Sequence, residues 1–355
     1  MYALVVLTTL VASILSFTSS KNCTIHNFTE VSSVLQRCSE ITVFNVTVPA
    51  GNTLEFNLKK NSVVTLEGTI TFQFQAWKGP LLEFKGDGIT VKGTKGSVID
   101  GRGELYWDHL GDKGLTKPQL VNIVASNDSV FQNLHLRNCP NHCFYIRNSD
   151  NVTISEIDID VSDGNKNNFT GHNTDGFNLG FVTNTIIKNC TVKNQDDCVS
   201  INAASNISIR NMDCSGGHGL SISVTRNPVD NVTYSDSIVR NSANGLHVKT
   251  HTNGGETVIS NITYKNIKLE GITNFGINIQ EDYKDGEGTG IPANNIKIVN
   301  LIITNITGTM NGKDSKPVQI ICGDTGCANW QWSDIYIVGN STPSYCNYAP
   351  SGFNC

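Results

Sequence analysis

The chain has 355 residues and a formal net charge of −5, with 26 Lys and Arg against 31 Asp and Glu. Such mild acidity without basic runs argues against nucleic acid as a partner. The uncharged run from Ala3 to Phe17 is shorter than the roughly 20 residues that span a bilayer, and it ends in small residues, Thr18-Ser19-Ser20. We expect residues 1–20 to be a secretory signal peptide. Residues 21–355 would form one extracellular domain, without membrane attachment.

Eleven cysteines in a secreted chain predict a disulfide framework with at least one free thiol. Neighbouring cysteines suggest the pairs Cys23/Cys38, Cys139/Cys143, Cys198/Cys214, Cys322/Cys327 and Cys346/Cys355, with Cys190 left over. Spacing alone leaves the states of Cys139, Cys143 and Cys190 open. None of the pairs forms the repeated C-x-x-C pattern of a zinc site. Glycosylation sequons such as those at Asn27 and Asn231 also favour secretion.

The first expected element is a short helix within Asn27 to Cys38, which would cap one end of the fold. Beyond it, a phrase of Asn followed by β-branched residues recurs at intervals of 33, 22, 25, 30 and 34 residues, beginning at Asn151, Asn184, Asn206, Asn231, Asn261 and Asn295. Recurrence with variable insertions is typical of a solenoid. The leucine-rich repeat phrase, its main rival at this period, is absent. We therefore predict an all-β fold, a single-stranded right-handed parallel β-helix with a short N-terminal helical cap.

Four polar phrases within about 110 residues are candidates for a site: Asn173-Thr174-Asp175-Gly176, Gln195-Asp196-Asp197-Cys198, Gly216-Gly217-His218-Gly219 and Gly245 to Lys249. Each alone would usually be a turn. Positions one β-helix coil apart lie about 4.8 Å from one another, so the coil spacing predicts three carboxylates, an imidazole and an ammonium on one wall. Stacked carboxylates raise each other's pKa. Glycoside hydrolysis needs such a protonated acid beside an ionised carboxylate.

The phrases N-T-D-G, D-D-C and G-G-H-G-L-S-I, with a later K-T, resemble the signature of the polygalacturonases. These are pectin-degrading glycoside hydrolases with a β-helix fold. The similarity covers most of the chain after residue 20. It includes the run from Ile99 to Asp108, Asp282-Tyr283, and the segment from Cys322 to Trp332.

The resemblance implies inverting hydrolysis of α-1,4-galacturonosyl links in homogalacturonan, with endo action favoured over exo action. Asp196 would be the general acid, while Asp175 and Asp197 would activate water. His218 would tune the acid and touch the substrate. The implied substrate-binding residues are Lys249, His247, Tyr283 and Asn173. Cys198 and Cys214 match a disulfide that braces the site, and no cofactor or metal is implied.

One departure concerns the residue that accompanies Lys249. The family's usual R-I-K reads His247-Val248-Lys249 here, so a permanently charged guanidinium is replaced by an imidazole. The alternative function is therefore a catalytically impaired homologue that binds pectin or acts as a decoy for plant polygalacturonase-inhibiting proteins. Those inhibitors are also candidate partners of an active enzyme, which we expect to be a monomer that prefers demethylated pectin.

Overall fold

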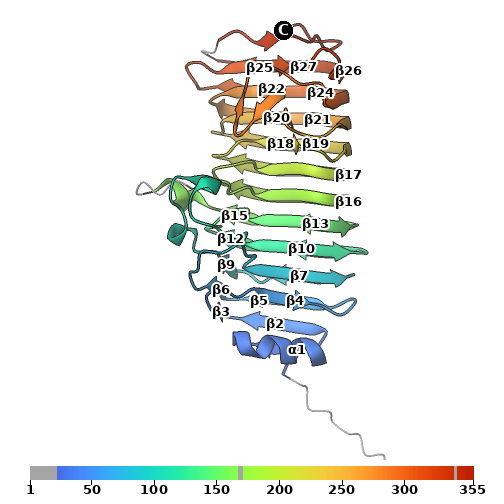
Figure 1. Cartoon of the computed structure of the whole chain (residues 1–355). Coiled ribbons are helices and arrows are strands. Elements are labelled where there is room, and N and C mark those ends of the chain that lie inside the picture. Colours follow the sequence, from blue (N-terminus) through green and yellow to red (C-terminus); the bar gives the residue numbers. More distant parts are fainter. Residues whose placement is uncertain (1–21, 167–170, 340–341) are drawn as a thin grey trace, which may run out of the picture.

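The computed structural model describes residues 22–166, 171–339 and 342–355, so the predicted signal peptide lies outside the described residues. Coils of parallel strands stack from the helix α1 at one end to the C-terminus at the other (Figure 1). The predicted parallel β-helix is confirmed. None of the helices in the described ranges has the length and apolar character required to cross a membrane.

Each complete coil contributes to three rows of parallel strands. The first row, called the cleft sheet, contains β4 (Leu54–Asn57), β7 (Leu82–Asp87), β10 (Val121–Ser126), β13 (Phe144–Asp150), β18 (Leu220–Val224), β20 (Asn244–His251), β22 (Phe275–Lys284), β25 (Lys316–Ile321) and β28 (Tyr345–Cys346). The long strands β16 (Phe177–Lys193) and β17 (Val199–Ser215) enter this row with their first residues and continue around the coil.

The second row contains β1 (Thr24–Ile25), β2 (Glu40–Phe44), β5 (Val63–Glu67), β8 (Thr90–Gly93), β11 (Ser129–Gln132) and β14 (Val152–Ser155). The third contains β3 (Thr47–Val48), β6 (Thr69–Phe72), β9 (Val98–Asp100), β12 (His135–Arg137) and β15 (Asp158–Asp160). Later coils run through both rows as β19 (Val229–Arg240), β21 (Thr257–Ile272), β24 (Ile296–Met310) and β27 (Gln331–Val338). The short β23 (Glu287–Gly288) pairs antiparallel with β22, and β26 (Cys327–Ala328) pairs with β24.

Asparagines in the left-handed conformation form a ladder at the bend between two rows. Asn206 donates through Nδ2 to Asn184 Oδ1 (3.0 Å), and Asn231 donates in the same way to Asn206 (2.8 Å). All three have φ between 50° and 58°, a region that Asn tolerates better than most residues. The repeated phrase is thus confirmed as the signal of each coil.

The prediction that Asn295 begins the last repeat is wrong. The ladder residue above Asn261 is Asn300, whose Nδ2 lies 3.0 Å from Asn261 Oδ1. Asn295 instead holds a loop through hydrogen bonds to His251 O and Gly254 O. Both asparagines precede alternating apolar residues, so the sequence pattern could not separate them. Pairing of Ile262 with Leu301 decides the register.

The interior of the solenoid is filled by apolar side chains that stack from coil to coil. Phe144 lies over Phe177 with ring centroids 5.3 Å apart, and Tyr234 lies over Tyr264 at 4.7 Å. Burying one such ring stabilises the fold by about 1.5–3 kcal/mol. Because these residues alternate with outward-facing ones, every second residue of the cleft sheet points into the cleft.

The N-terminal cap consists of the 3₁₀ helix η1 (Phe28–Glu30) and α1 (Val31–Arg37), as predicted. Asn27 caps η1, and Val34 of α1 is buried against the first coil. A cap of this kind shields apolar side chains that the end coil would otherwise expose.

Five disulfides join the suggested neighbours: Cys23–Cys38, Cys139–Cys143, Cys198–Cys214, Cys322–Cys327 and Cys346–Cys355. Cys190 is free and buried, and burial raises the pKa of its thiol to about 12. The thiol is therefore neutral and unreactive near neutral pH.

Loops that carry three short 3₁₀ helices project from one side of the middle coils (Figure 1). These helices are η2 (Gly103–Leu105), η3 (Gly111–Lys113) and η4 (Ser162–Asn165). The buried Lys117 ammonium fastens the η3 loop by binding Asp108 Oδ1 and Gly111 O, each at 2.8 Å. Gly111 of this loop lies against Asn173, in the turn that precedes β16 and carries Asp175.

Candidate active site

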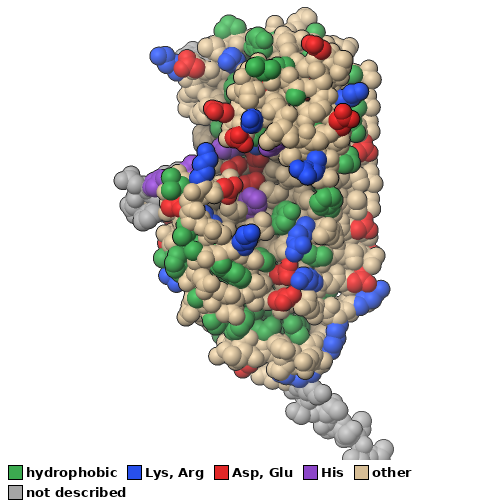
Figure 2. Space-filling view, viewed as in Figure 1, with side chains coloured by type: hydrophobic (Ala, Val, Ile, Leu, Met, Phe, Trp, Pro, Cys, Tyr) green, Lys and Arg blue, Asp and Glu red, His purple; other side chains and the backbone are tan. Residues whose placement is uncertain are grey.

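The acidic residues lie at the start of successive strands in the cleft sheet. The strands β16, β17 and β18 pair through three residues that lie directly above one another: Phe177, Val199 and Leu220. Asp175, Asp197 and His218 each precede one of these positions by two residues, so they too stack coil upon coil. The coil spacing read from the sequence is confirmed. Acidic and histidine side chains gather in a hollow on one face of the molecule (Figure 2).

Each of the two neighbouring carboxylates has a cationic partner. His218 Nδ1 lies 3.1 Å from Asp196 Oδ1, and Lys249 Nζ lies 3.1 Å from Asp197 Oδ2. Ser221 Oγ also donates to Asp197 Oδ1 at 2.6 Å. The Asp197 side chain is only 3% exposed, whereas that of Asp196 is 18% exposed. Asp196 is therefore the carboxyl of this pair that a ligand in the cleft reaches more easily.

Asp175, the third carboxyl, has weaker partners. Asn178 Nδ2 donates to its Oδ2 at 3.1 Å, and His142 Nε2 lies 3.7 Å from its Oδ1. Burial raises the pKa of Asp175 well above its ordinary value, and the charges of Asp196 and Asp197 raise it further. Lys249 opposes this shift without overcoming it. The environment of Asp175 therefore favours the protonated carboxyl.

The pair Asp196 and His218 behaves in the opposite way. Burial acts to raise the pKa of Asp196, but the hydrogen bond and charge of His218, helped by Lys249, hold it below its ordinary value. Burial likewise acts to lower the pKa of His218, but the hydrogen bond and charge of Asp196 raise it. The free site thus favours ionised Asp196 beside protonated His218. A general acid at Asp196 would have to be protonated instead. Without substrate, the pKa that the stacked carboxylates raise is that of Asp175 and not that of Asp196.

Lys249, Tyr283 and His247 line a cavity of about 280 Å³ beside the aspartates. The Lys249 ammonium lies 5.1 Å from the centre of the Tyr283 ring, a cation–π distance. Burial acts to lower the pKa of Lys249, but the charges of Asp197 and Tyr283 raise it above its ordinary value. The residue is accordingly charged over the whole working pH range of a hydrolase.

His247, at the position of the expected family Arg, is 6% exposed. Its Nδ1 lies 3.4 Å from Asn244 Nδ2, and its ring meets Tyr283 edge-on at 6.2 Å. Burial lowers the pKa of His247 well below its ordinary value, and the neighbouring charges of Lys249 and His218 add to this. A neutral imidazole thus lines the cavity at a position where a guanidinium was expected.

The fourth predicted binding residue, Asn173, lies in the turn before Asp175 with φ 55°. Its side chain packs against Gly111 of the η3 loop, where an added Cβ would come within 2.9 Å of Asn173 Oδ1. The structure therefore places Asn173 where it joins the flanking loop to the turn that carries Asp175.

Sequence reasoning missed His142 and Ser221, both of which face the carboxylates. Ser221 could have been found from strand alternation, because it follows the buried Leu220 and must point outward into the cleft. His142 lies in the short loop between Cys139 and Phe144, and no local pattern marks it. Only the stacking of β13 against β16 brings it beside Asp175.

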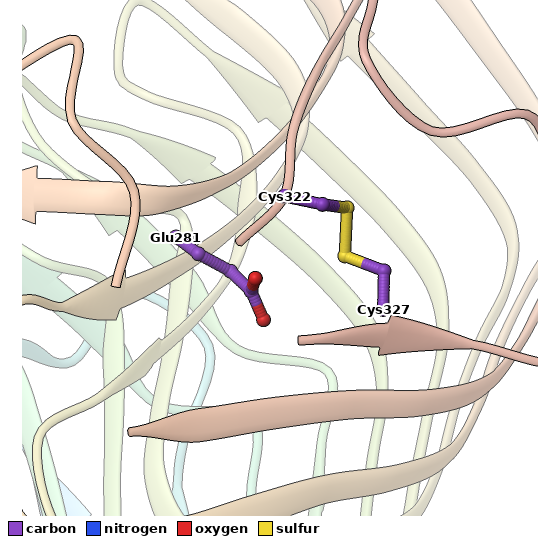
Figure 3. Close-up of side chains that lie close together, drawn as sticks. All are labelled: Glu281, Cys322 and Cys327. Carbon is purple, nitrogen blue, oxygen red and sulfur yellow. A yellow bond between two sulfur atoms is a disulfide. The ribbon is translucent and has the colours of Figure 1, made fainter. Parts of the chain in front are cut away.

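Among the residues that the structure describes, two groups of side chains have their donor atoms close enough to hold a metal ion: Asp196 with Asp197 and His218, and Glu281 with Cys322 and Cys327. In the first group, Lys249 and His218 already bind the carboxylate oxygens. In the second group the two sulfur atoms form a disulfide, with the Glu281 carboxyl pointing towards it (Figure 3). The thiolates that a metal would require are therefore not available there.

Comparison with known proteins agrees with this geometry. Residues 38–355 match the family model described as glycosyl hydrolases family 28. The chain belongs to glycosyl hydrolases family 28. It is 46% identical over 346 residues to a polygalacturonase of Phaedon cochleariae, covering 95% of this chain and 94% of that protein. It is also 41% identical over 343 residues to endopolygalacturonase I of Aspergillus niger, covering 95% of this chain and 92% of that protein.

A solved structure of the same kind is that of endopolygalacturonase I from Stereum purpureum complexed with two galacturonate molecules. It superposes with a TM-score of 0.83 at 31% identity, covering 91% of this chain and 96% of the other. The family 28 match includes every candidate site residue, since all of them lie between residues 38 and 355.

Proposed function

We propose that this family 28 chain is an endo-acting polygalacturonase that hydrolyses α-1,4-galacturonosyl links in homogalacturonan with inversion at the anomeric carbon. The observation that carries the proposal is the stack of Asp175, Asp196 and Asp197 with Lys249 and His218 as its cationic partners. Three carboxyls supply acid and base groups, and two cations suit an anionic sugar. The relatives at 41–46% identity support the same reaction.

Asp196 acts as general acid because it is the more exposed carboxyl of its pair and can reach the leaving oxygen. Its lowered pKa must rise when substrate binds. A galacturonate carboxylate that engages Lys249 and His218 draws these cations away from Asp196 and adds a negative charge nearby. Both effects favour the protonated carboxyl. Asp175, whose environment favours the protonated carboxyl, can supply that proton from within the same cluster.

Asp175 and Asp197 orient the attacking water and take up its proton. Asp197 is suited to this role because Ser221 and Lys249 bind its two oxygens and fix the carboxylate plane. His218 contacts the substrate and tunes Asp196. Positioned acid and base groups of this type accelerate hydrolysis by roughly 10²–10⁴-fold each.

Lys249 binds a carboxylate of the polymer. The Tyr283 ring, over which the Lys249 ammonium lies, lines the cleft. Methyl esterification removes the charge that Lys249 would recognise, so the preferred substrate is demethylated pectin. We also propose that the enzyme is secreted and works as a monomer, and that plant polygalacturonase-inhibiting proteins can recognise it. The five disulfides support an extracellular location.

Neutral His247 favours a second candidate, a pectin-binding protein with impaired catalysis. A charged hydrogen bond to a substrate carboxylate is worth about 1.5–3 kcal/mol, and neutral His247 can offer at most one N–H donor where an Arg would offer a permanently charged fork. This weakens binding without removing any of the three carboxyls, so hydrolysis remains the main proposal.

The test is reducing-end release from demethylated polygalacturonic acid between pH 4 and pH 7, with Asp196→Asn as a matched variant of the same size. Release by the wild type and its loss in the variant would support the hydrolase and the assigned acid. A folded wild-type protein that retains the polymer but releases no ends at any pH would refute hydrolysis in favour of binding. Product lengths early in the reaction distinguish endo from exo action.

A further inference from the structure

The second row of strands carries a polar hollow of about 480 Å³, outside the cleft sheet. It extends from the asparagine ladder at one bend to Asp236 at the next bend. Arg210 and Lys265 line this hollow, and the parallel registers place Ser235 directly between them. The backbones of the two basic residues are therefore two coils, or roughly 10 Å, apart along the solenoid axis. Two long cationic side chains thus flank a short one.

The cations of this hollow differ from a cation of the neighbouring third row in their partners. On the third row, Arg240 binds Asp213 at 3.0 Å and Glu270 at 2.6 Å, so its charge is neutralised. Within the described part of the chain, the side chains of Arg210 and Lys265 form neither an ion pair nor a hydrogen bond. Lys265 is exposed and Arg210 is half-buried. Both charges are therefore available to an anion from solvent.

Asp236 is the one acidic residue among those that line the hollow. Its Oδ1 accepts a hydrogen bond from Asn266 Nδ2 at 2.9 Å, so another partner already holds this carboxylate. Two cations and one carboxylate leave the lining with a net positive charge. Lys188 lies one coil before Arg210 in the same column of outward side chains and adds a further cation to this row.

Hydrogen-bonding groups without a protein partner lie beside these cations. The asparagine ladder is interrupted above Asn231, because Asn261 donates to Asp230 Oδ1 (2.7 Å) instead. In the described ranges, Asn231 Oδ1 accepts no hydrogen bond, and the paired residues Ser208 and Thr233 have hydroxyls without a partner. Basic side chains bind carboxylates, and amide oxygens and hydroxyls bind sugar hydroxyls. The hollow therefore matches a sugar that carries a carboxylate.

We propose that the hollow lined by Arg210 and Lys265 is a second, non-catalytic binding site for an anionic polysaccharide with carboxylates on its sugar units. That this polymer is demethylated homogalacturonan rests on the proposed function. The polymer runs along the solenoid axis, with Arg210 and Lys265 on the carboxylates of two of its units. Asn231 and Thr233 bind hydroxyls of the same segment. The site holds the protein on the polymer while the cleft releases one segment and takes up another.

The experiment measures retention on immobilised polygalacturonic acid by affinity electrophoresis. All proteins carry Asp196→Asn, so that the polymer is not cut during the measurement. An exposed ion pair changes an affinity by a factor of about 1.4 to 5. We therefore expect Arg210→Gln/Lys265→Gln to weaken retention about three- to tenfold. In about 1 M sodium chloride, where the Debye length is roughly 3 Å, the difference should disappear.

The matched control is Lys193→Gln/Lys268→Gln, which removes the same charge from the third row. It should retain the polymer like the parent. In proteins with Asp196 intact, Arg210→Gln/Lys265→Gln should raise KM for the polymer about three- to tenfold. Its kinetics on the galacturonate trimer should equal those of wild type, because the cleft is unchanged.

Three results would overturn the site. These are undiminished retention in Arg210→Gln/Lys265→Gln, an equal loss in the control variant, and equal Arg210-dependent retention on polyglutamate, which carries carboxylates without sugar rings. The control result would mean that only the overall charge matters. The single variants Arg210→Gln and Lys265→Gln test the same points should the double variant unfold.

Failure of this site and failure of the proposed reaction give different results. If the protein with Asp196 intact hydrolyses nothing, but Arg210→Gln/Lys265→Gln weakens retention and the control does not, the reaction fails while the site stands. If hydrolysis occurs and both retention and the KM for polymer are independent of Arg210 and Lys265, the site fails while the reaction stands.

Discussion

The buried carboxyl of Glu281 makes the stability of the C-terminal coils depend on pH. Glu281 is fully buried, and its Oε2 accepts a hydrogen bond from Gly323 N at 2.7 Å, in the loop closed by the Cys322–Cys327 disulfide (Figure 3). Burial raises the pKa of Glu281 to about 7 from 4.5, against the effect of the Gly323 hydrogen bond. The ionised form is therefore disfavoured in the folded state.

The sign of the effect follows from proton uptake. Below pH 4.5 the carboxyl is protonated in both states, and its ionisation has no influence on folding. Between pH 4.5 and about 7, only the unfolded chain loses the proton, so the free energy of unfolding falls as pH rises. Above pH 7 the loss is complete. A difference of about 2.5 pKa units at 1.36 kcal/mol each amounts to roughly 3 kcal/mol.

Glu281→Gln removes this dependence, because an amide stays neutral while its oxygen can still accept from Gly323 N. Urea unfolding of wild type and variant at pH 4.5 and pH 8 measures the free energy of unfolding in each case. We expect the variant to gain roughly 3 kcal/mol relative to wild type between the two pH values. Glu256→Gln, at an exposed site, should show no such gain. Parallel pH profiles for wild type and Glu281→Gln would refute the reasoning.

Three further predictions concern the site. His247→Arg should increase hydrolysis of polygalacturonic acid about tenfold or more, through a new charged contact; unchanged kinetics would mean that the neutral imidazole does not limit the enzyme. Lys249→Met should lower the free energy of unfolding in urea by about 3–5 kcal/mol, because it leaves the Asp197 carboxylate buried without its ion pair. The same substitution should abolish measurable hydrolysis. Near-wild-type activity would show that Lys249 is not part of the active site. Proton NMR of early products should show the β-anomer first from the α-linked polymer, and initial α-anomer would disprove inversion.

The sequence by itself determined the fold and the neighbourhood of the site. Asn at the bends and alternating Ile and Val between them specify parallel coils, because left-handed Asn residues can stack and hydrogen-bond while apolar residues stack inside. Once the coil length near Asp175 is known, Asp197 and His218 must lie above it. Closeness along the chain suggested the disulfide partners, but the states of Cys139, Cys143 and Cys190 were decided by the structure.

The tertiary structure decided the strand register, the pKa shifts of the buried carboxyls and the contacts between residues far apart in the sequence, because these depend on packing between coils and on burial. The choice between Asn295 and Asn300 as the last ladder residue rests on strand register, which two similar phrases leave undetermined. The proton preference of Asp175 over Asp196 arises from the separate positions of Lys249 and His218 around buried carboxyls. The anchoring of Arg147 on Glu83 joins residues 64 positions apart. A repeat specifies which coil a residue occupies, but burial and contacts between coils determine its protonation state and the partners that its side chain binds.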